Sequence, residues 1–190
     1  MKVMAFNGSP RGDGNTAAAL KLVMEVLEKE GISTELIQLG GSGIQPCKSC
    51  FYCFEKGEGF CSQKDVLNPW LEKIYQAQGL LIGSPVYFGG VSGETKAFID
   101  RLGLCSMGGN YKLKRKVGAA VIAVKRHGAV EVFNQINSLF ALNQMVIPCS
   151  IYWNFGFGGE PGEILKDEEG VETFRVLGEN MAWVMKKLCG

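Results

Sequence analysis

Short apolar runs alternate with amphipathic stretches along this chain. The apolar or alternating runs predict strands at residues 3–7, 34–39, 79–83, 117–124 and 145–153. Stretches with apolar residues at helical spacing predict helices at residues 16–30, 65–76, 93–104, 129–143 and 171–188. Strand and helix alternate five times, which predicts a parallel, doubly wound α/β sheet.

The chain length and composition suit one globular domain, which we expect to span residues 1–190 with a cysteine-rich insertion at 44–63. The formal net charge is +1, so neither a nucleic-acid nor an anionic membrane partner is expected. A strand within the first six residues leaves no room for a signal peptide, and no apolar run approaches the roughly 20 residues of a membrane span. We therefore expect a cytoplasmic protein.

The loop after the first predicted strand is rich in groups that bind anions. In a doubly wound sheet, ligands bind at the carboxyl ends of the strands, and this loop leads directly into a helix. Small residues allow backbone N–H groups to converge on an anion at the helix start. The candidate ligands of a terminal phosphate are Ser9, Arg11, Gly14, Asn15 and Thr16. The plain alternative is an ordinary turn with a helix cap.

Two other phosphate motifs fit this loop poorly. A nucleotide-triphosphatase loop needs a lysine that is missing here. Gly12, Gly14 and Ala17 match a dinucleotide fingerprint, but the second strand ends in Gln38 and Leu39 without the acidic residue that binds a ribose. The loop is therefore interpreted as a site for a phosphate monoester.

Two further loops belong to the same predicted edge of the sheet. After the third strand, a proline fixes the exit of the chain, glycine lets the backbone approach a flat ligand, and aromatic rings can stack on it. The candidates are Pro85, Val86, Tyr87, Phe88 and Gly89. The alternative is a simple hydrophobic turn. After the fourth strand, the run Lys125-Arg126-His127-Gly128 places cations where a negatively charged ring edge would need them, and Arg126, His127 and Gly128 are further candidates. A solvated histidine explains His127 equally well.

Four of the seven cysteines, Cys47, Cys50, Cys53 and Cys61, follow the spacing C-x2-C-x2-C-x7-C. Thiolates this close together can ligate a 4Fe–4S cluster. A zinc site and redox-active dithiols remain open, and oxygen-sensitive clusters can be lost on purification. Cys105 and Cys149 are expected to be small buried residues, and Cys189 an incidental thiol.

Three stretches together resemble the NADPH-dependent FMN reductase branch of the flavodoxin-like superfamily, and more specifically the iron–sulfur flavoproteins of anaerobic prokaryotes. They are the run from Phe6 to Thr16, the cysteine motif, and the run from Ser84 to Arg101, and the resemblance covers roughly residues 1 to 150. The loop from Lys125 to Gly128 departs from the pattern, because relatives commonly have more glycine there.

The resemblance implies a flavodoxin-like three-layer sandwich with strand order 2-1-3-4-5 and non-covalently bound FMN. It further implies an oxidoreductase that passes electrons between the flavin and a 4Fe–4S cluster, with NAD(P)H as a possible reductant and a redox protein or small molecule as acceptor. Related proteins assemble as homodimers or homotetramers, and the aromatic residues of the cysteine segment and of residues 153–157 suit an interface. The alternatives are an NAD(P)H-dependent FMN or quinone reductase without a cluster, and a non-catalytic flavodoxin-type carrier.

Overall fold

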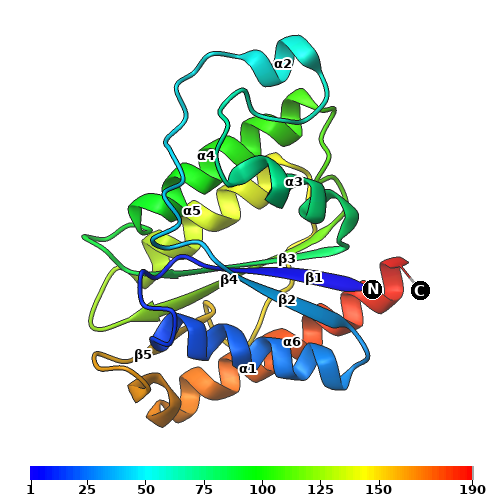
Figure 1. The fold of residues 1–190 in the computed structure, drawn as a ribbon. Coiled ribbons are helices and arrows are strands. Elements are labelled where there is room, and N and C mark those ends of the chain that lie inside the picture. Colours follow the sequence, from blue (N-terminus) through cyan, green and yellow to red (C-terminus); the bar gives the residue numbers. More distant parts are fainter. Residues whose placement is uncertain (190) are drawn as a thin grey trace.

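The computed structural model describes residues 1–189 and contains a parallel sheet between two layers of helices (Figure 1). The strands lie in the order β2-β1-β3-β4-β5, which confirms the predicted flavodoxin-like topology. Their bounds are β1 (Lys2–Asn7), β2 (Ser33–Gln38), β3 (Gly79–Pro85), β4 (Val117–Val124) and β5 (Phe155–Phe157). Every strand pair is parallel, so all five carboxyl ends meet at one edge of the sheet.

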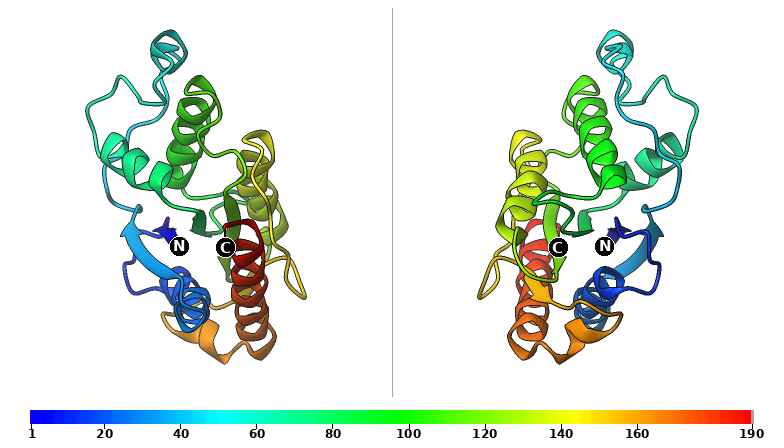
Figure 2. Two further views of the ribbon diagram at one scale, coloured as in Figure 1. Left: turned by 90° about the vertical axis from the view of Figure 1, so that its right-hand side faces the viewer. Right: turned by 90° about the vertical axis from the view of Figure 1, so that its left-hand side faces the viewer.

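The helices form one layer on each face of the sheet (Figure 2). One layer contains α1 (Asn15–Lys29), α6 (Glu168–Cys189) and the 3-10 helix η1 (Glu163–Lys166). The other contains α3 (Leu67–Gln76), α4 (Gly93–Gly108) and α5 (Ala129–Leu142), with the short α2 (Tyr52–Lys56) lying over α4. The predicted helices are confirmed to within a few residues, whereas α2 was not predicted.

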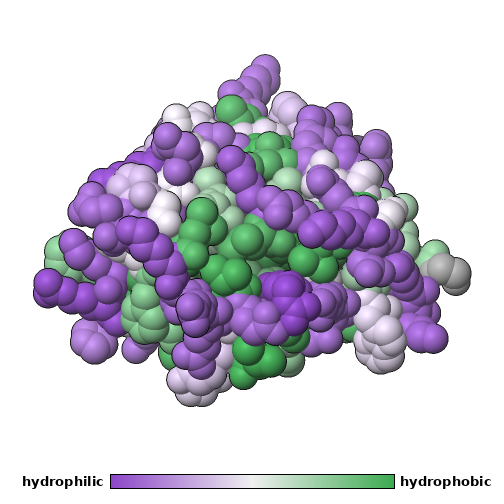
Figure 3. Space-filling model, turned by 90° about the horizontal axis from the view of Figure 1, so that it is seen from below, coloured by the Kyte–Doolittle hydropathy of each residue, from purple (hydrophilic) through white to green (hydrophobic). Residues whose placement is uncertain are grey.

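The core is divided by the sheet, because successive side chains of a strand point to opposite faces. Met4 and Phe6 pack toward α3 and α4, where the rings of Phe6 and Phe98 are 4.5 Å apart. Val3 and Ala5 pack toward α1 and α6. Seen from the side of α1 and α6, hydrophobic residues occupy the middle of the surface and polar residues surround them (Figure 3). No helix among residues 1–189 is long and apolar enough to cross a membrane.

The last strand lies later in the chain than predicted. The run 145–153 pairs with β4 only at a single bridge between Val146 and Val117, and the chain then leaves the sheet. It returns at Phe155, which pairs with Ile122. Between these two pairings the chain advances nine positions, from Val146 to Phe155, whereas β4 advances five, from Val117 to Ile122. The extra residues form a bulge around Pro148. Pro148 has no N–H to donate, which explains why pairing stops there.

Candidate functional site

The loop between β1 and α1 presents free backbone donors. Helix α1 begins at Asn15 after Gly14, and no side chain caps it. The first N–H groups of a helix have no acceptor within the helix, so a bound anion can accept from them. Ser9 and Thr16 are buried beside this helix start, and Arg11 is exposed. The local structure is therefore that of an anion site.

Two polar residues that the sequence analysis did not select hold this loop in place. Asn7 is fully buried and donates to the Arg11 carbonyl at 3.2 Å and to Gln38 Oε1 at 2.7 Å. Gln38 in turn donates to the carbonyl of Ser9 at 2.6 Å and to that of Gly40 at 2.8 Å. The Gly14 N–H also donates to the Arg11 carbonyl at 3.4 Å, so backbone and side-chain hydrogen bonds together hold the loop.

A cavity of about 260 Å³ opens above this loop. Its walls bring together eight of the thirteen residues predicted for the cofactor: Ser9, Arg11, Gly14, Asn15, Thr16, Pro85, Val86 and Tyr87. Lys125, Ala123, Gly158 and Gly159 complete the wall. The lining contains two cations and no carboxylate, which is the charge balance that a phosphate monoester requires.

A second cavity of about 430 Å³ shares Val86 and Lys125 with the first. It is lined by four more predicted residues, Phe88, Gly89, Arg126 and His127. The remaining one, Gly128, lines a neighbouring cavity together with Arg126, Phe155 and Phe157. The three predicted loops therefore meet at the carboxyl edge of the sheet.

Phe88 is held in an unusual conformation at this edge. Tyr87 and Gly90 exchange backbone hydrogen bonds of 2.8 and 3.0 Å, and the two residues between them, Phe88 and Gly89, both have positive φ. A bulky residue rarely adopts this conformation. The turn directs the Phe88 side chain into solvent, at the rim of the cavity of about 430 Å³ that it lines.

Asn15, a predicted phosphate donor, lines the cavity and also makes two hydrogen bonds to a distant segment. Its Nδ2 donates to the Glu160 carbonyl at 2.9 Å, and its Oδ1 accepts from the Ile164 backbone N–H at 3.4 Å. These bonds hold the segment before η1 against the start of α1, so Gly158 and Gly159 complete the wall of the cavity.

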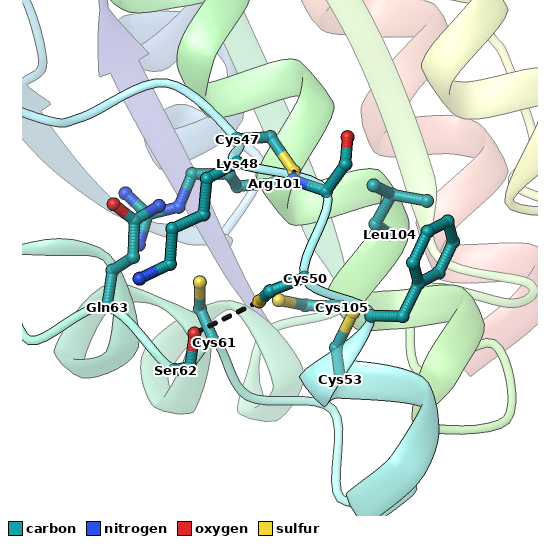
Figure 4. A pocket seen from close by; sticks show the side chains of 12 residues that line it. Cys47, Lys48, Cys50, Cys53, Cys61, Ser62, Gln63, Arg101, Leu104 and Cys105 are labelled. Atoms are coloured by element: carbon teal, nitrogen blue, oxygen red, sulfur yellow. Dashed lines mark hydrogen bonds between the residues drawn. The ribbon is translucent and has the colours of Figure 1, made fainter.

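The cysteine motif folds around a further cavity, the cysteine cavity (Figure 4). It shares no residue with the cavity above the loop between β1 and α1. All four predicted cysteines line it, as does Cys105 of α4. In Figure 4 the sulfurs of Cys50, Cys53, Cys61 and Cys105 lie near one another, and that of Cys47 stands apart. Cys105 is buried as predicted, but the prediction for Cys149 was wrong, because this residue is exposed on the segment that bulges from the sheet.

Two of the four cysteines are attached firmly to the body of the fold. The side chain of Asn68 makes two hydrogen bonds to the Cys61 backbone: its Oδ1 accepts from the Cys61 N–H and its Nδ2 donates to the Cys61 carbonyl, both at 2.9 Å. The Cys53 backbone rests on Gly108 of α4, where an added Cβ would overlap the Cys53 carbonyl. Cys47 and Cys50 lie on the outer turn of the segment, where Cys50 is exposed.

A buried ion pair closes the ends of the cysteine segment. Arg101 of α4 donates to both carboxylate oxygens of Asp65, at 2.5 and 2.9 Å, and to the Gln45 carbonyl at 3.0 Å. The Gln45 N–H donates to the same Asp65 at 3.1 Å. Burial raises the pKa of Asp65, but the hydrogen bond and charge of Arg101, together with the backbone N–H groups of Gln45 and Leu67, lower it more, so the carboxylate stays ionised. Residues on both sides of the cysteines are thus held together on α4.

The thiols around the cavity differ in how readily they ionise. Burial raises the pKa of Cys53 and, more strongly, that of Cys105. A hydrogen bond with Ser62, with the two atoms 3.2 Å apart, lowers the pKa of the exposed Cys50. Cys105 is therefore the thiol least suited to act as a thiolate ligand.

The donor set fits an iron–sulfur cube better than a single ion. Among residues 1–189, no three His, Cys, Asp or Glu side chains converge as ligands of one metal ion. In a cube each cysteine binds a different iron, so the four sulfurs need not converge on one point. The enclosed space is about 20 Å³, so a cube requires the outer turn with Cys47 and Cys50 to move outward.

Comparison with known proteins shows the family of this chain. Residues 1–160 match the model of the NADPH-dependent FMN reductase family. The chain belongs to this family. It is 38% identical to an iron–sulfur flavoprotein of Methanocaldococcus jannaschii over 98% of both chains, and 30% identical to one of Methanosarcina thermophila over 100% of this chain and 94% of that one. Within the family it is thus a member of the iron–sulfur flavoproteins, and it is a flavin-dependent oxidoreductase.

Solved structures share the fold of this iron–sulfur flavoprotein. RosB with bound 8-demethyl-8-formylriboflavin-5'-phosphate is 18% identical, with a TM-score of 0.76 over 99% of this chain and 80% of that one. A WrbA-like flavodoxin from Agrobacterium tumefaciens is 17% identical, with a TM-score of 0.67 over 98% of both chains. At these identities the likeness confirms the flavodoxin-like fold.

Several residues of the two sites were not predicted from the sequence. Lys125 stands in a loop that the sequence singled out, so its charge was the available signal. Asn7, Gln38 and Asn68 act through hydrogen bonds to distant backbone groups, and Arg101 pairs with a residue 36 positions away. No local pattern marks such pairs.

Proposed function

We propose that this protein binds FMN with its phosphate at the start of α1 and its ring system along the loops after β3 and β4. Ser9, Thr16 and the free N–H groups of α1 would hold the phosphate, and Arg11 would balance its charge. The observation that supports this best is the cation-lined cavity without carboxylates over an uncapped helix start. Asn15 would shape the site rather than contact the phosphate.

The loops after β3 and β4 would hold the flavin ring. Val86 and Tyr87 line the cavity of about 260 Å³ proposed for the phosphate, called the phosphate cavity. Val86 also lines the adjoining cavity of about 430 Å³. Arg126 and His127 lie exposed on the outer wall, where positive charge favours electron uptake by a neighbouring group. No side chain is required as a nucleophile; the residues orient the ring and set the charge around it.

The four cysteines of the motif would ligate one 4Fe–4S cluster. Cys53 and Cys61 are already positioned on the folded body by Gly108 and Asn68, and Cys47 and Cys50 would close from the outer turn. When bound, FMN exchanges electrons singly or as hydride and the cluster passes one at a time, so the protein would connect two-electron donors with one-electron acceptors. The acceptor would be a redox protein or a small molecule.

Helix α4 connects the two proposed sites. Thr95 in its first turn lies 2.8 Å from the Ser92 hydroxyl, which donates to the carbonyl of Gly8 in the loop after β1. Cys105, further along the helix, lines the cysteine cavity. The ten residues between them correspond to about 15 Å along a helix. The two cavities share no residue, so electron transfer would cross protein or pass to a neighbouring subunit.

We also propose assembly as a homodimer or homotetramer, which the exposed aromatic residues support. Phe51 and Phe54 of the cysteine segment are exposed, as are Trp153 and Phe157 near β5, and none of the four lines the phosphate cavity. Apolar surface of this kind marks interfaces. Light scattering should detect a dimer or tetramer at micromolar concentration, and a monodisperse monomer would refute the assembly.

Anaerobic addition of NADPH to the purified protein tests the proposed reductase activity. Prompt bleaching of the flavin absorbance is expected. Absence of bleaching by NADPH and NADH, with full flavin content, would show a carrier that other proteins reduce.

A further inference from the structure

Arg101 is a fully buried cation in the wall of the cysteine cavity, and only part of its guanidinium group is paired. It is 1% exposed, and both terminal nitrogens donate to Asp65. Its remaining donor, the buried Nε–H, has no hydrogen-bond partner among the described residues. A buried donor without an acceptor is costly, so the fold keeps an N–H available at this wall.

The acceptor available in the same cavity wall is the sulfur of Cys61. Burial lowers the pKa of Arg101, but Asp65 and Cys61 together raise it more. Cys61 is fixed at this position by Asn68. A neutral thiol is a weak acceptor, whereas an iron-bound thiolate carries negative charge and accepts strongly. The unpaired N–H therefore suits Cys61 in its metal-bound form.

We propose that Arg101 is a positioning residue of the cysteine cavity: its Nε–H donates to the Cys61 sulfur when this sulfur is an iron ligand, and its charge favours the reduced cluster. The inference rests on the proposed cluster. A bound cluster that accepted one electron from the flavin would become more negative by one charge, which the buried cation Arg101 in the same cavity wall would stabilise. Arg101 would thus set the potential of the one-electron site as well as close its loop.

Three variants separate these two roles. Arg101→Met removes the charge and every donor. Arg101→Lys keeps the charge without the planar guanidinium donors. Asp65→Asn weakens the link between the segment ends but leaves the Arg101 side chain in place. Each protein is reconstituted anaerobically with iron and sulfide, its iron is counted, and the cluster potential is measured by a titration followed by paramagnetic resonance.

Arg101→Met should lower the equilibrium constant for cluster reduction at least about tenfold relative to the parent, which is about 59 mV for one electron. The equilibrium constant for cluster reduction in Arg101→Lys should lie between those of the parent and Arg101→Met. Asp65→Asn should not lower the cluster potential, even if it lowers the iron content. Resonance Raman spectra in D₂O should show an isotope shift of an Fe–S stretch in the parent and in Asp65→Asn that is absent in Arg101→Met.

Equal potentials and equal isotope shifts in the parent and the Arg101 variants would overturn the inference. A second outcome would also overturn it: both Arg101 variants lose as much iron as Asp65→Asn, and the cluster that remains keeps the potential of the parent. Arg101 would then be a purely structural link. A parent protein that takes up no iron and sulfide refutes the proposed cluster itself, and the inference with it.

Discussion

The hydroxyl of Ser92 donates a hydrogen bond of 2.7 Å to the carbonyl of Gly8, joining the cap of α4 to the loop after β1. The same hydroxyl accepts from the Thr95 N–H and lies 2.8 Å from Thr95 Oγ1. Gly8 must be glycine here, because a Cβ would overlap Thr95. One buried network therefore fixes the phosphate loop relative to the helix that carries Arg101 and Cys105.

Ser92→Ala should reduce both stability and FMN affinity. The substitution leaves the Gly8 carbonyl and the Thr95 N–H without their partner in a fully buried place. An unsatisfied buried group costs about 1–3 kcal/mol, so urea unfolding of the apoprotein should show a loss of about 2 kcal/mol. Ser138→Ala on the surface of α5 is the control and should stay within about 0.5 kcal/mol of the parent.

Ser9→Ala combined with Thr16→Ala should weaken FMN binding by about 2–4 kcal/mol. Each hydrogen bond to a charged phosphate contributes about 1.5–3 kcal/mol, and the effects of neighbouring substitutions do not add fully. Flavin fluorescence titration of the apoprotein measures this. Ser33→Ala, at the opposite end of the sheet, is the control. Unchanged affinity in the double variant would place the phosphate elsewhere, and recovery of FAD from the heated native protein would contradict the monoester site.

Replacement of Cys47, Cys50, Cys53 or Cys61 by Ala should each lower the iron content after anaerobic reconstitution. Cys105→Ala should retain iron, because burial raises the pKa of this thiol and disfavours the thiolate that iron requires. The exposed Cys149→Ala is the control for the handling of a surface cysteine. Four motif variants that all hold iron like the parent would show that the motif is not the ligand set.

Asp65→Asn should destabilise the protein at pH 7 by about 3 kcal/mol, since Arg101 would lose the charge of its buried partner. The pKa of Asp65 lies below its ordinary value in the folded protein. Its contribution to stability is therefore full above the unfolded-state pKa of about 4 and is lost as pH falls through the folded-state pKa. Denaturant unfolding at pH 7 and pH 3 should show the difference between parent and variant shrinking at the lower pH, and a difference that grows would contradict this.

Local patterns were sufficient for most of the fold. The continuous apolar run of β4 and the period of α1 reflect burial that each segment imposes by itself. The prediction for the last strand failed because the run 145–153 looks like a strand, whereas its pairing stops near Pro148 and resumes with the three-residue β5. Which part of an apolar run pairs is decided by its neighbour β4.

For the candidate sites too, local patterns indicated which segments come together but not the distant partners of single residues. Close spacing gathers the cysteines, and topology gathers the three loops at the carboxyl edge. The role of Asn15 depends on the Glu160 carbonyl, 145 residues later, and that of Arg101 depends on Asp65 across the motif. Such partners are set by packing of distant segments, for which a single sequence carries no local signal.

The most direct test of the account is a count of flavin, iron and sulfide in protein purified without oxygen, together with its visible and paramagnetic resonance spectra. The account predicts about one FMN, four iron atoms and four sulfides per chain, and a resonance signal from the cluster after reduction. FMN with zinc or with free thiols in place of iron and sulfide would contradict it.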